Sequence, residues 1–294
     1  MSDAEPVVAF WQRLGLPGLY DVHVHFLPPR LEAKVWEQFD VAGPKIGREW
    51  PIRYRGTAEE RLTQLRSFGV RAFPTLPYAH RPGVAPWLNA WSREFAEAVP
   101  EALWSATFYP EPEAAAYVGE LVVEGVRLFK VHTQVGEFHL DDPLLRDVWG
   151  LLEDSGTPAL VHAGSGPVGN DFTGPASMAR LLAEHPRLRI VVAHLGAPET
   201  DGFARLAASY DHVHLDTSMA VSRFFAGDGA DARELAPLLR DLAPRVLFGS
   251  DFPTLPFAYG EQLDALAELG LGNDWLRDVC WHNAVRLLGE PAVV

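Results

Sequence analysis

The chain has 294 residues, of which 48% are hydrophobic and 22% are charged, so it can bury a large core within one domain. Its formal net charge of −14 leaves no basic stripe for a phosphate backbone, which argues against nucleic acid as a partner. One cysteine excludes an internal disulfide, the N-terminus lacks a secretory signal and no apolar run is long enough to cross a bilayer. We therefore expect a cytoplasmic protein with no membrane partner.

Short apolar runs alternate with helical patterns along the whole chain. The apolar runs predict strands at 19–26, 69–76, 103–109, 125–131, 158–163, 188–195, 212–217 and 245–251. Helical patterning and capping signals predict helices at 57–68, 86–98, 111–123, 142–155, 175–185, 199–209, 231–241 and 260–269.

Strands that alternate with helices predict parallel βαβ units, and eight such units close into a barrel. We expect an α/β fold, a TIM (β/α)8 barrel over about residues 19–270, with an extra C-terminal helix at 274–288. The longest insertion, 27–56, follows the first strand and is expected to be a loop. No linker divides the chain, which predicts a single domain over 1–294. The alternative is an open doubly wound sheet, but neither of the usual glycine-rich phosphate loops follows any strand.

Polar and apolar residues alternate in the first predicted strand. Asp21, His23 and His25 share one face, while Val22 and Val24 point the other way. Two imidazoles at positions i and i+2 of a strand can reach one ion at the roughly 2.0–2.1 Å that zinc prefers. The plain alternative is a pair of half-buried or surface histidines.

More ligand-type side chains stand at the ends of other predicted strands. They are Lys130 and His132 at the end of the fourth strand, His162 at the end of the fifth, His194 at the end of the sixth and Asp251 at the end of the eighth. Each alone could be a hydrogen-bonded loop residue. Together they stand at the carboxyl ends of strands, where a barrel carries its active site, and zinc takes imidazole and carboxylate ligands. The pattern therefore predicts a metal site.

The strand-end motifs resemble those of the amidohydrolase superfamily. More narrowly, they resemble its amidohydrolase-related branch, which includes aminocarboxymuconate semialdehyde decarboxylase and related hydrolases. The resemblance covers Leu19 to Leu288 and rests on His23-Val24-His25, on His162 and His194, and on Gly249-Ser250-Asp251-Phe252-Pro253.

The resemblance implies one divalent metal ion, usually zinc. The implied ligands are His23, His25, His162 and Asp251, and His194 would lie beside the metal-bound water as a base or electrostatic helper. In two-metal members a carboxylated lysine bridges the ions, and Lys130 keeps that alternative open. The spacing of Lys130 and His132 nevertheless resembles the single-metal branch.

A bound divalent ion lowers the pKa of water from 15.7 to about 7, so the implied activity is a metal-dependent hydrolase that uses a metal-activated water. Asp251 could accept the proton of that water, and His194 could orient it or stabilise an oxyanion. Asp21 either orients a ligand imidazole or is a structural buried carboxylate.

The expected substrate is a small carboxylated lactone, ester or amide. Arg81 and Arg223, whose guanidinium groups bind carboxylates, and His132 are candidates for binding it, although loop arginines are usually solvated. One alternative is a non-oxidative decarboxylase of an unsaturated or aromatic acid, which shares nearly all of the site. Another is a barrel that binds a ligand without turnover. One lactonase branch of the superfamily works without metal.

Members of the family are commonly dimeric, so a homodimer is compatible with the resemblance.

Overall fold

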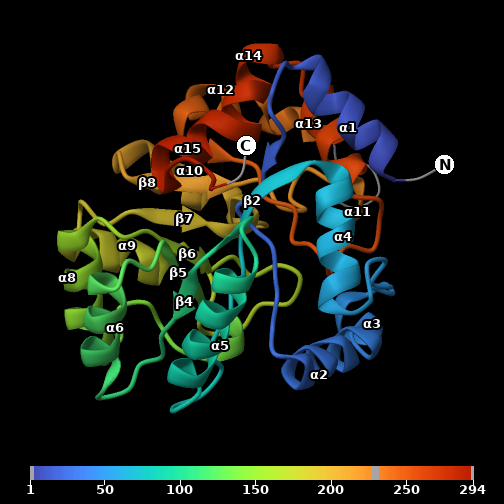
Figure 1. The fold of residues 1–294 in the computed structure, drawn as a ribbon. Helices are drawn as coiled ribbons and strands as arrows, with labels where there is room; N and C mark the ends of the chain where they lie inside the picture. Colours follow the sequence, from blue (N-terminus) through green and yellow to red (C-terminus); the bar gives the residue numbers. More distant parts are fainter. Residues whose placement is uncertain (1–2, 227–231, 293–294) are drawn as a thin grey trace. The chain divides into compact units, whose positions relative to one another are not determined.

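The computed structural model describes residues 3–226 and 232–292, which fall into two compact units. Unit 1 comprises Met1–Pro74 and Thr217–Val294, and unit 2 comprises Thr75–Asp216. Both units contain strands and helices (Figure 1). Within the described ranges, no helix has the length and apolar character that a membrane span requires.

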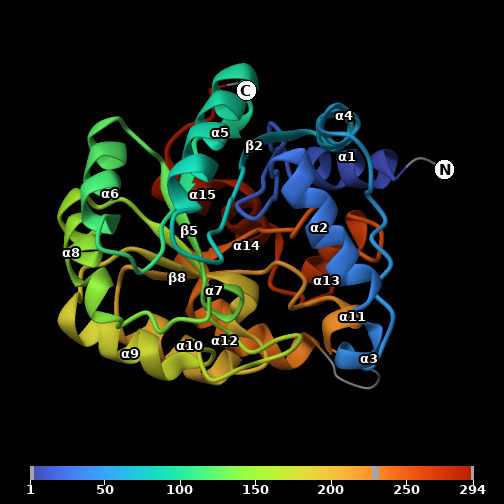
Figure 2. The same ribbon diagram turned by 90° about the horizontal axis from the view of Figure 1, so that it is seen from below.

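Unit 1 is built from short strands and the helices near both ends of the chain. Strands β1 and β2 pair in parallel, with Leu19 opposite Val70 and Tyr20 opposite Ala72. Helix α1 lies against α4 (Figure 2). The elements of unit 1 are α1 (Ala4–Arg13), β1 (Leu19–Tyr20), α2 (Pro29–Asp40), α3 (Gly43–Ile46), α4 (Ala58–Phe68), β2 (Val70–Pro74), α11 (Arg223–Ala226), η3 (Ala232–Leu235), α12 (Ala236–Asp241), η4 (Ala243–Arg245), β9 (Val246–Leu247), α13 (Gly260–Glu268), α14 (Asn273–Arg277), η5 (Asp278–His282) and α15 (Asn283–Leu288).

Unit 2 contains a parallel sheet in which β4, β5, β6, β7 and β8 lie in sequence order. Helices α6 and α8 pack side by side (Figures 1 and 2). The elements of unit 2 are α5 (Ala85–Ala98), β3 (Ala102–Leu103), β4 (Ser105–Thr107), α6 (Ala114–Val123), β5 (Leu128–His132), α7 (Thr133–Gly136), η1 (Pro143–Leu145), α8 (Arg146–Ser155), β6 (Ala159–His162), α9 (Pro175–Glu184), β7 (Ile190–Val192), η2 (Ala193–Gly196), α10 (Thr200–Ser209) and β8 (Val213–Asp216).

The apolar runs become strands because parallel strands are buried on both faces. Every residue of β6 and β7 is buried. The predicted capping box also forms at the start of α4. Thr57 Oγ1 accepts the Glu60 N–H at 3.2 Å, and the Glu60 carboxylate accepts the Thr57 N–H at 2.8 Å. The helix ends at Gly69, whose φ of +76° suits a residue without a Cβ.

The first strand is shorter than the sequence predicts. Regular pairing stops at Tyr20, although Val24 forms an isolated bridge with Phe252. Between them the carboxylate of Asp21 accepts the His23 N–H, so a side chain replaces a neighbouring strand as the partner of this backbone group. The segment stays extended, and Val22 and Val24 are buried as the alternation predicts.

Other boundaries also differ from the predicted ones. The insertion after the first strand is not only a loop, because it contains α2 and α3, and α1 precedes β1 without a prediction. The predicted strand 103–109 is divided between β3 and β4. The predicted helix 274–288 consists of α14, a π-helical turn and α15. Residue 231, the predicted start of helix 231–241, lies outside the described residues.

Candidate metal centre

Three ligand-type side chains of unit 1 converge on one point. His23 Nε2 lies 3.2 Å from His25 Nε2 and 3.5 Å from Asp251 Oδ1, and His25 Nε2 lies 3.2 Å from the same oxygen. The side chain of His23 is 1% exposed, that of His25 12% and that of Asp251 13%. The cluster is therefore shielded, with its open side at His25 and Asp251.

These spacings fit a bound divalent ion. Two donors that each lie about 2.0–2.1 Å from a tetrahedral zinc ion are roughly 3.3–3.4 Å apart. The three atoms of the cluster meet that requirement without any rearrangement. Two neutral imidazoles and one carboxylate also form a donor set that zinc and related ions accept. The residues present thus fit a divalent metal.

Further contacts fix the His23 ring and its backbone. Ser218 Oγ lies 3.0 Å from His23 Nδ1, on the side of the ring away from the cluster. A partner at Nδ1 orients an imidazole and decides which nitrogen carries the lone pair. His23 O accepts the Asp251 N–H at 2.8 Å, so the segments that carry the two residues are joined directly.

Asp21 accepts hydrogen bonds from two backbone N–H groups and from a tyrosine hydroxyl. Its Oδ1 accepts the Ser250 N–H at 2.9 Å and the His23 N–H at 3.1 Å, while Oδ2 accepts the Tyr259 hydroxyl at 2.8 Å. Burial raises the pKa of Asp21 to about 7, against the lowering effect of these hydrogen bonds. This carboxylate therefore joins the backbone N–H of His23 to the backbone N–H of Ser250, the residue before Asp251.

Asp251 occupies a tight turn after β9. Its φ is +69°, in the left-handed region that aspartate tolerates better than most residues. The Thr254 N–H donates to Asp251 O at 3.0 Å and closes the turn. Thr254 Oγ1 lies 2.8 Å from Asp251 Oδ2, the oxygen that does not face the histidines. The turn thus presents Oδ1 to His23 and His25.

Unit 2 carries a second cluster at the carboxyl ends of its strands. His132 and His162 are paired residues of β5 and β6, and their rings stack with centroids 4.0 Å apart at 12°. The His194 ring meets the His162 ring edge-on at 4.7 Å. Lys130 is fully buried on β5. Parallel register explains this arrangement, since strands that end together place their last side chains together.

His194 sits at a sharp bend directly after β7. Its φ is +56° and that of Leu195 is +52°, so the chain turns away at the end of the strand. Asp216 Oδ1 accepts the His194 N–H at 3.0 Å and holds this bend from the end of β8. The bend turns the His194 ring against His162.

The His162 ring has a backbone contact of its own. Its Nε2 lies 3.1 Å from Gly166 O, so with the proton on Nε2 the ring donates there and its lone pair is on Nδ1. Glu199 holds the same loop, because its carboxylate accepts the Ser165 N–H at 3.0 Å and contacts the Ser165 hydroxyl.

The arginines predicted as substrate contacts lie on the surface. Arg81 is exposed in the loop after β2. The Arg223 side chain is 92% exposed and lies 3.8 Å from the Glu268 carboxylate. The ring centroids of His132 and Tyr78 are 5.2 Å apart, and the Val135 N–H donates to His132 Nδ1 at 3.4 Å.

Sequence reasoning did not find the residues that hold the clusters. These are Ser218, Thr254 and Tyr259 in unit 1, and Asp216 and Glu199 in unit 2. Position is a signal for three of them, since Asp216 ends β8, Ser218 follows two residues later and Thr254 lies three residues after Asp251.

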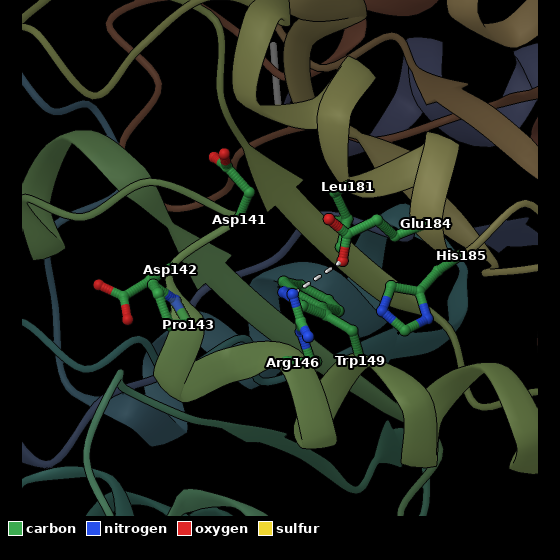
Figure 3. Close-up of a pocket in the computed structure, with 8 residues that line it drawn as sticks. All are labelled: Asp141, Asp142, Pro143, Arg146, Trp149, Leu181, Glu184 and His185. Carbon is green, nitrogen blue, oxygen red and sulfur yellow. Dashed lines mark ion pairs between the residues drawn. The ribbon is translucent and has the colours of Figure 1, made fainter.

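A small surface depression lies between α8 and α9 of unit 2 (Figure 3). Arg146 and Glu184 face each other across it at 3.8 Å, and Trp149 lines it. None of the clustered histidines lines this depression. Its main charges already pair, so it offers no converging donors for a metal.

Fold and site together define an α/β protein of the TIM-barrel type whose strands lead to clustered histidines and an aspartate, one cluster fitting a divalent metal. A family model described as Amidohydrolase matches residues 20–289. The chain therefore belongs to the amidohydrolase family, a family of enzymes, as the motifs predict. No curated protein matches the sequence.

Solved structures share the fold over nearly the whole chain. An uncharacterized TIM-barrel protein from Bordetella bronchiseptica is 20% identical with a TM-score of 0.73, covering 92% of this chain and 98% of that one. A 5-carboxyvanillate decarboxylase from Novosphingobium aromaticivorans, complexed with manganese and 4-hydroxy-3-methoxy-5-nitrobenzoic acid, is 13% identical with a TM-score of 0.68, covering 93% and 96%. A probable 2-pyrone-4,6-dicarboxylic acid hydrolase from Acinetobacter baumannii, with citric acid bound, is 12% identical with a TM-score of 0.62, covering 93% and 100%. The TIM-barrel fold class predicted from the sequence is thereby confirmed.

Proposed function

We propose that this protein is a metal-dependent hydrolase that acts on a small carboxylated lactone, ester or amide with one divalent ion, zinc. The observation that carries the proposal is the convergence of His23, His25 and Asp251 at 3.2–3.5 Å. Membership of the amidohydrolase family supports it, because hydrolysis is the activity of many members. When bound, such an ion supplies Lewis acidity and a low-pKa water.

The remaining ligand and helper are assigned from the family pattern. His162 is the fourth ligand in this proposal, and His194 orients the attacking water or stabilises an oxyanion. Asp251 accepts a proton at the carboxylate that also faces the two imidazoles. Lys130 stays unmodified in the single-metal arrangement; a second ion bridged by carboxylated Lys130 is the alternative.

The substrate class follows from the ligands of structural neighbours. The Novosphingobium decarboxylase binds a hydroxybenzoic acid and the Acinetobacter hydrolase binds citric acid, and both molecules carry carboxylates. We infer a carboxylated substrate here as well, with Arg81, Arg223 and His132 as the candidate contacts. A homodimer and a cytoplasmic location remain predictions from the sequence.

A decarboxylase is the second candidate. Two neighbours from different bacteria are 5-carboxyvanillate decarboxylases, and the one from Novosphingobium holds manganese. The same donor set serves either reaction, since a metal can polarise an oxygen of a bound acid as well as of a lactone. Manganese is then the alternative to zinc.

One set of measurements tests these candidates. The purified protein is analysed for its metal content, then offered lactones, esters and amides of small acids, and separately aromatic and unsaturated acids. Acid release that requires the metal supports the hydrolase, and carbon dioxide release supports the decarboxylase instead. A protein that contains no metal and cannot be loaded with zinc or manganese contradicts both and supports a ligand-binding barrel. Asp251→Asn is the inactive control in each assay.

A further inference from the structure

A chain of hydrogen bonds leads from the insertion after β1 to the Asp251 carboxylate. Trp50 Nε1 donates to Thr254 O at 2.7 Å, and Thr254 Oγ1 lies 2.8 Å from Asp251 Oδ2. Trp50 is 5% exposed and Thr254 is 7% exposed, so water competes little for either bond. The insertion thus holds the turn that presents Asp251.

The threonine hydroxyl has one proton and two acceptors within reach. Asp251 O lies at 2.7 Å and Asp251 Oδ2 at 2.8 Å from Thr254 Oγ1. The carbonyl already accepts the Thr254 N–H at 3.0 Å. A carboxylate is the stronger acceptor, since a hydrogen bond to an ionised group is roughly twice as strong as a neutral one. The proton therefore goes to Oδ2.

A donor on Oδ2 decides the orientation of the carboxylate. The terminal torsion of aspartate is broad and roughly twofold, so an unrestrained carboxylate turns easily. With Oδ2 held by Thr254, Oδ1 lies 3.2 Å from His25 Nε2 and 3.5 Å from His23 Nε2. The ligand atom is thus in place before an ion arrives.

Trp50 in turn fixes the turn that carries Thr254. Its ring contacts those of Phe39 and Phe224, with centroid distances of 5.5 Å and 4.9 Å, and these contacts restrict the direction of the indole N–H. Arg53 N–H donates to Leu255 O at 2.8 Å, so the neighbouring carbonyl is held as well. Two successive peptides of the turn are therefore bound by one segment of the insertion.

We propose that Thr254 is a positioning residue that preorganises Asp251 for metal, and that Trp50 positions Thr254. The inference rests on the proposed function, because it assigns Asp251 to a divalent ion. It goes beyond that function by giving the insertion a part in metal affinity, which a purely structural insertion would lack.

The test measures zinc affinity by competition with a chromogenic chelator, on the full-length protein. We expect Thr254→Val to weaken zinc binding by about 10–100-fold, the usual effect of losing a partner of a metal ligand. Thr254→Ser keeps the hydroxyl and should bind within about threefold of the wild type, since the donor is restored. Trp50→Phe keeps an aromatic ring but loses the N–H, and an intermediate loss of about 3–10-fold is expected.

Two control variants make the same chemical changes elsewhere in unit 1. Thr217→Val removes a buried hydroxyl for which the described residues provide no hydrogen-bond partner. Trp275→Phe removes an indole N–H that donates to Leu239 O at 3.2 Å, the same type of bond as that of Trp50. Both controls should bind zinc like the wild type.

The outcomes separate this inference from the proposed function. If the wild type binds zinc and Thr254→Val binds it equally well, the positioning role is wrong while the metal site stands. If the wild type takes up no metal, the proposed function fails and this inference fails with it. Should Thr254→Val not fold, as judged by thermal unfolding of the metal-free protein, Trp50→Phe against Trp275→Phe decides the question.

Discussion

The two histidine clusters are held in different ways. In unit 1 the Nε2 atoms of His23 and His25 face each other and a carboxylate oxygen, an arrangement of lone-pair atoms that a cation stabilises. In unit 2 the rings of His132 and His162 lie face to face, and His162 Nε2 contacts a backbone carbonyl. In unit 1 the donor atoms therefore already converge on one point, whereas in unit 2 stacking and a backbone contact fix the directions of the rings.

The largest effect is expected at Asp251, because the assignment of the unit 1 cluster to a metal depends on this carboxylate. Asp251→Asn removes a charged ligand and a proton acceptor at once, so we expect turnover to fall by about 10²–10⁴-fold or more. The substitution keeps the size of the side chain, and thermal unfolding should show an intact fold. An active Asp251→Asn enzyme, measured by kcat on any accepted substrate, contradicts the assignment.

The next largest effects separate the clusters directly. His23→Ala should lose bound metal, because it removes one of three converging donors. His194→Ala should keep its metal and lose turnover by about 10²-fold, as expected for a group that only orients or protonates. Elemental analysis of both variants is the measurement. Metal loss from His194→Ala would favour two ions bridged by a carboxylated Lys130.

A smaller effect is expected at Ser218, whose hydroxyl lies at His23 Nδ1. Ser218→Ala should weaken metal binding by about 10-fold, since the imidazole loses the partner that orients it. Chelator competition measures the change, and Ser67→Ala on α4 is the control, because that hydroxyl bonds to Gln64 of its own helix. Unchanged affinity would mean that packing alone orients the His23 ring.

The smallest effect is expected for the stability of Arg223→Ala. The side chain is 92% exposed and pairs with Glu268, and exposed ion pairs contribute about 0–1 kcal/mol. We expect the free energy of unfolding in denaturant to change by less than about 0.5 kcal/mol. The same variant tests substrate binding, because a KM raised about tenfold or more would support a carboxylate contact.

Local pattern predicted the elements of unit 2 well. The apolar runs at 125–131 and 158–163 become β5 and β6, because a strand buried on both faces needs continuous apolar sequence. The helices of the insertion at 27–56 were not predicted, since α2 is polar on average and its N-terminus lacks a side-chain cap. Glu32 of this helix is buried against Arg61 of α4, a contact between two helices that local sequence patterns cannot predict.

The sequence by itself determined the family, through its motifs, and the residue types that stand near the strand ends, because motifs and apolar runs are local features of the chain. Only the tertiary structure decided what holds those residues. Ser218 lies 195 residues from His23, Tyr259 lies 238 residues from Asp21, and Trp50 lies 204 residues from Thr254. A hydrogen bond needs its two atoms within about 3 Å, and folding alone brings groups so far apart in the chain to that distance.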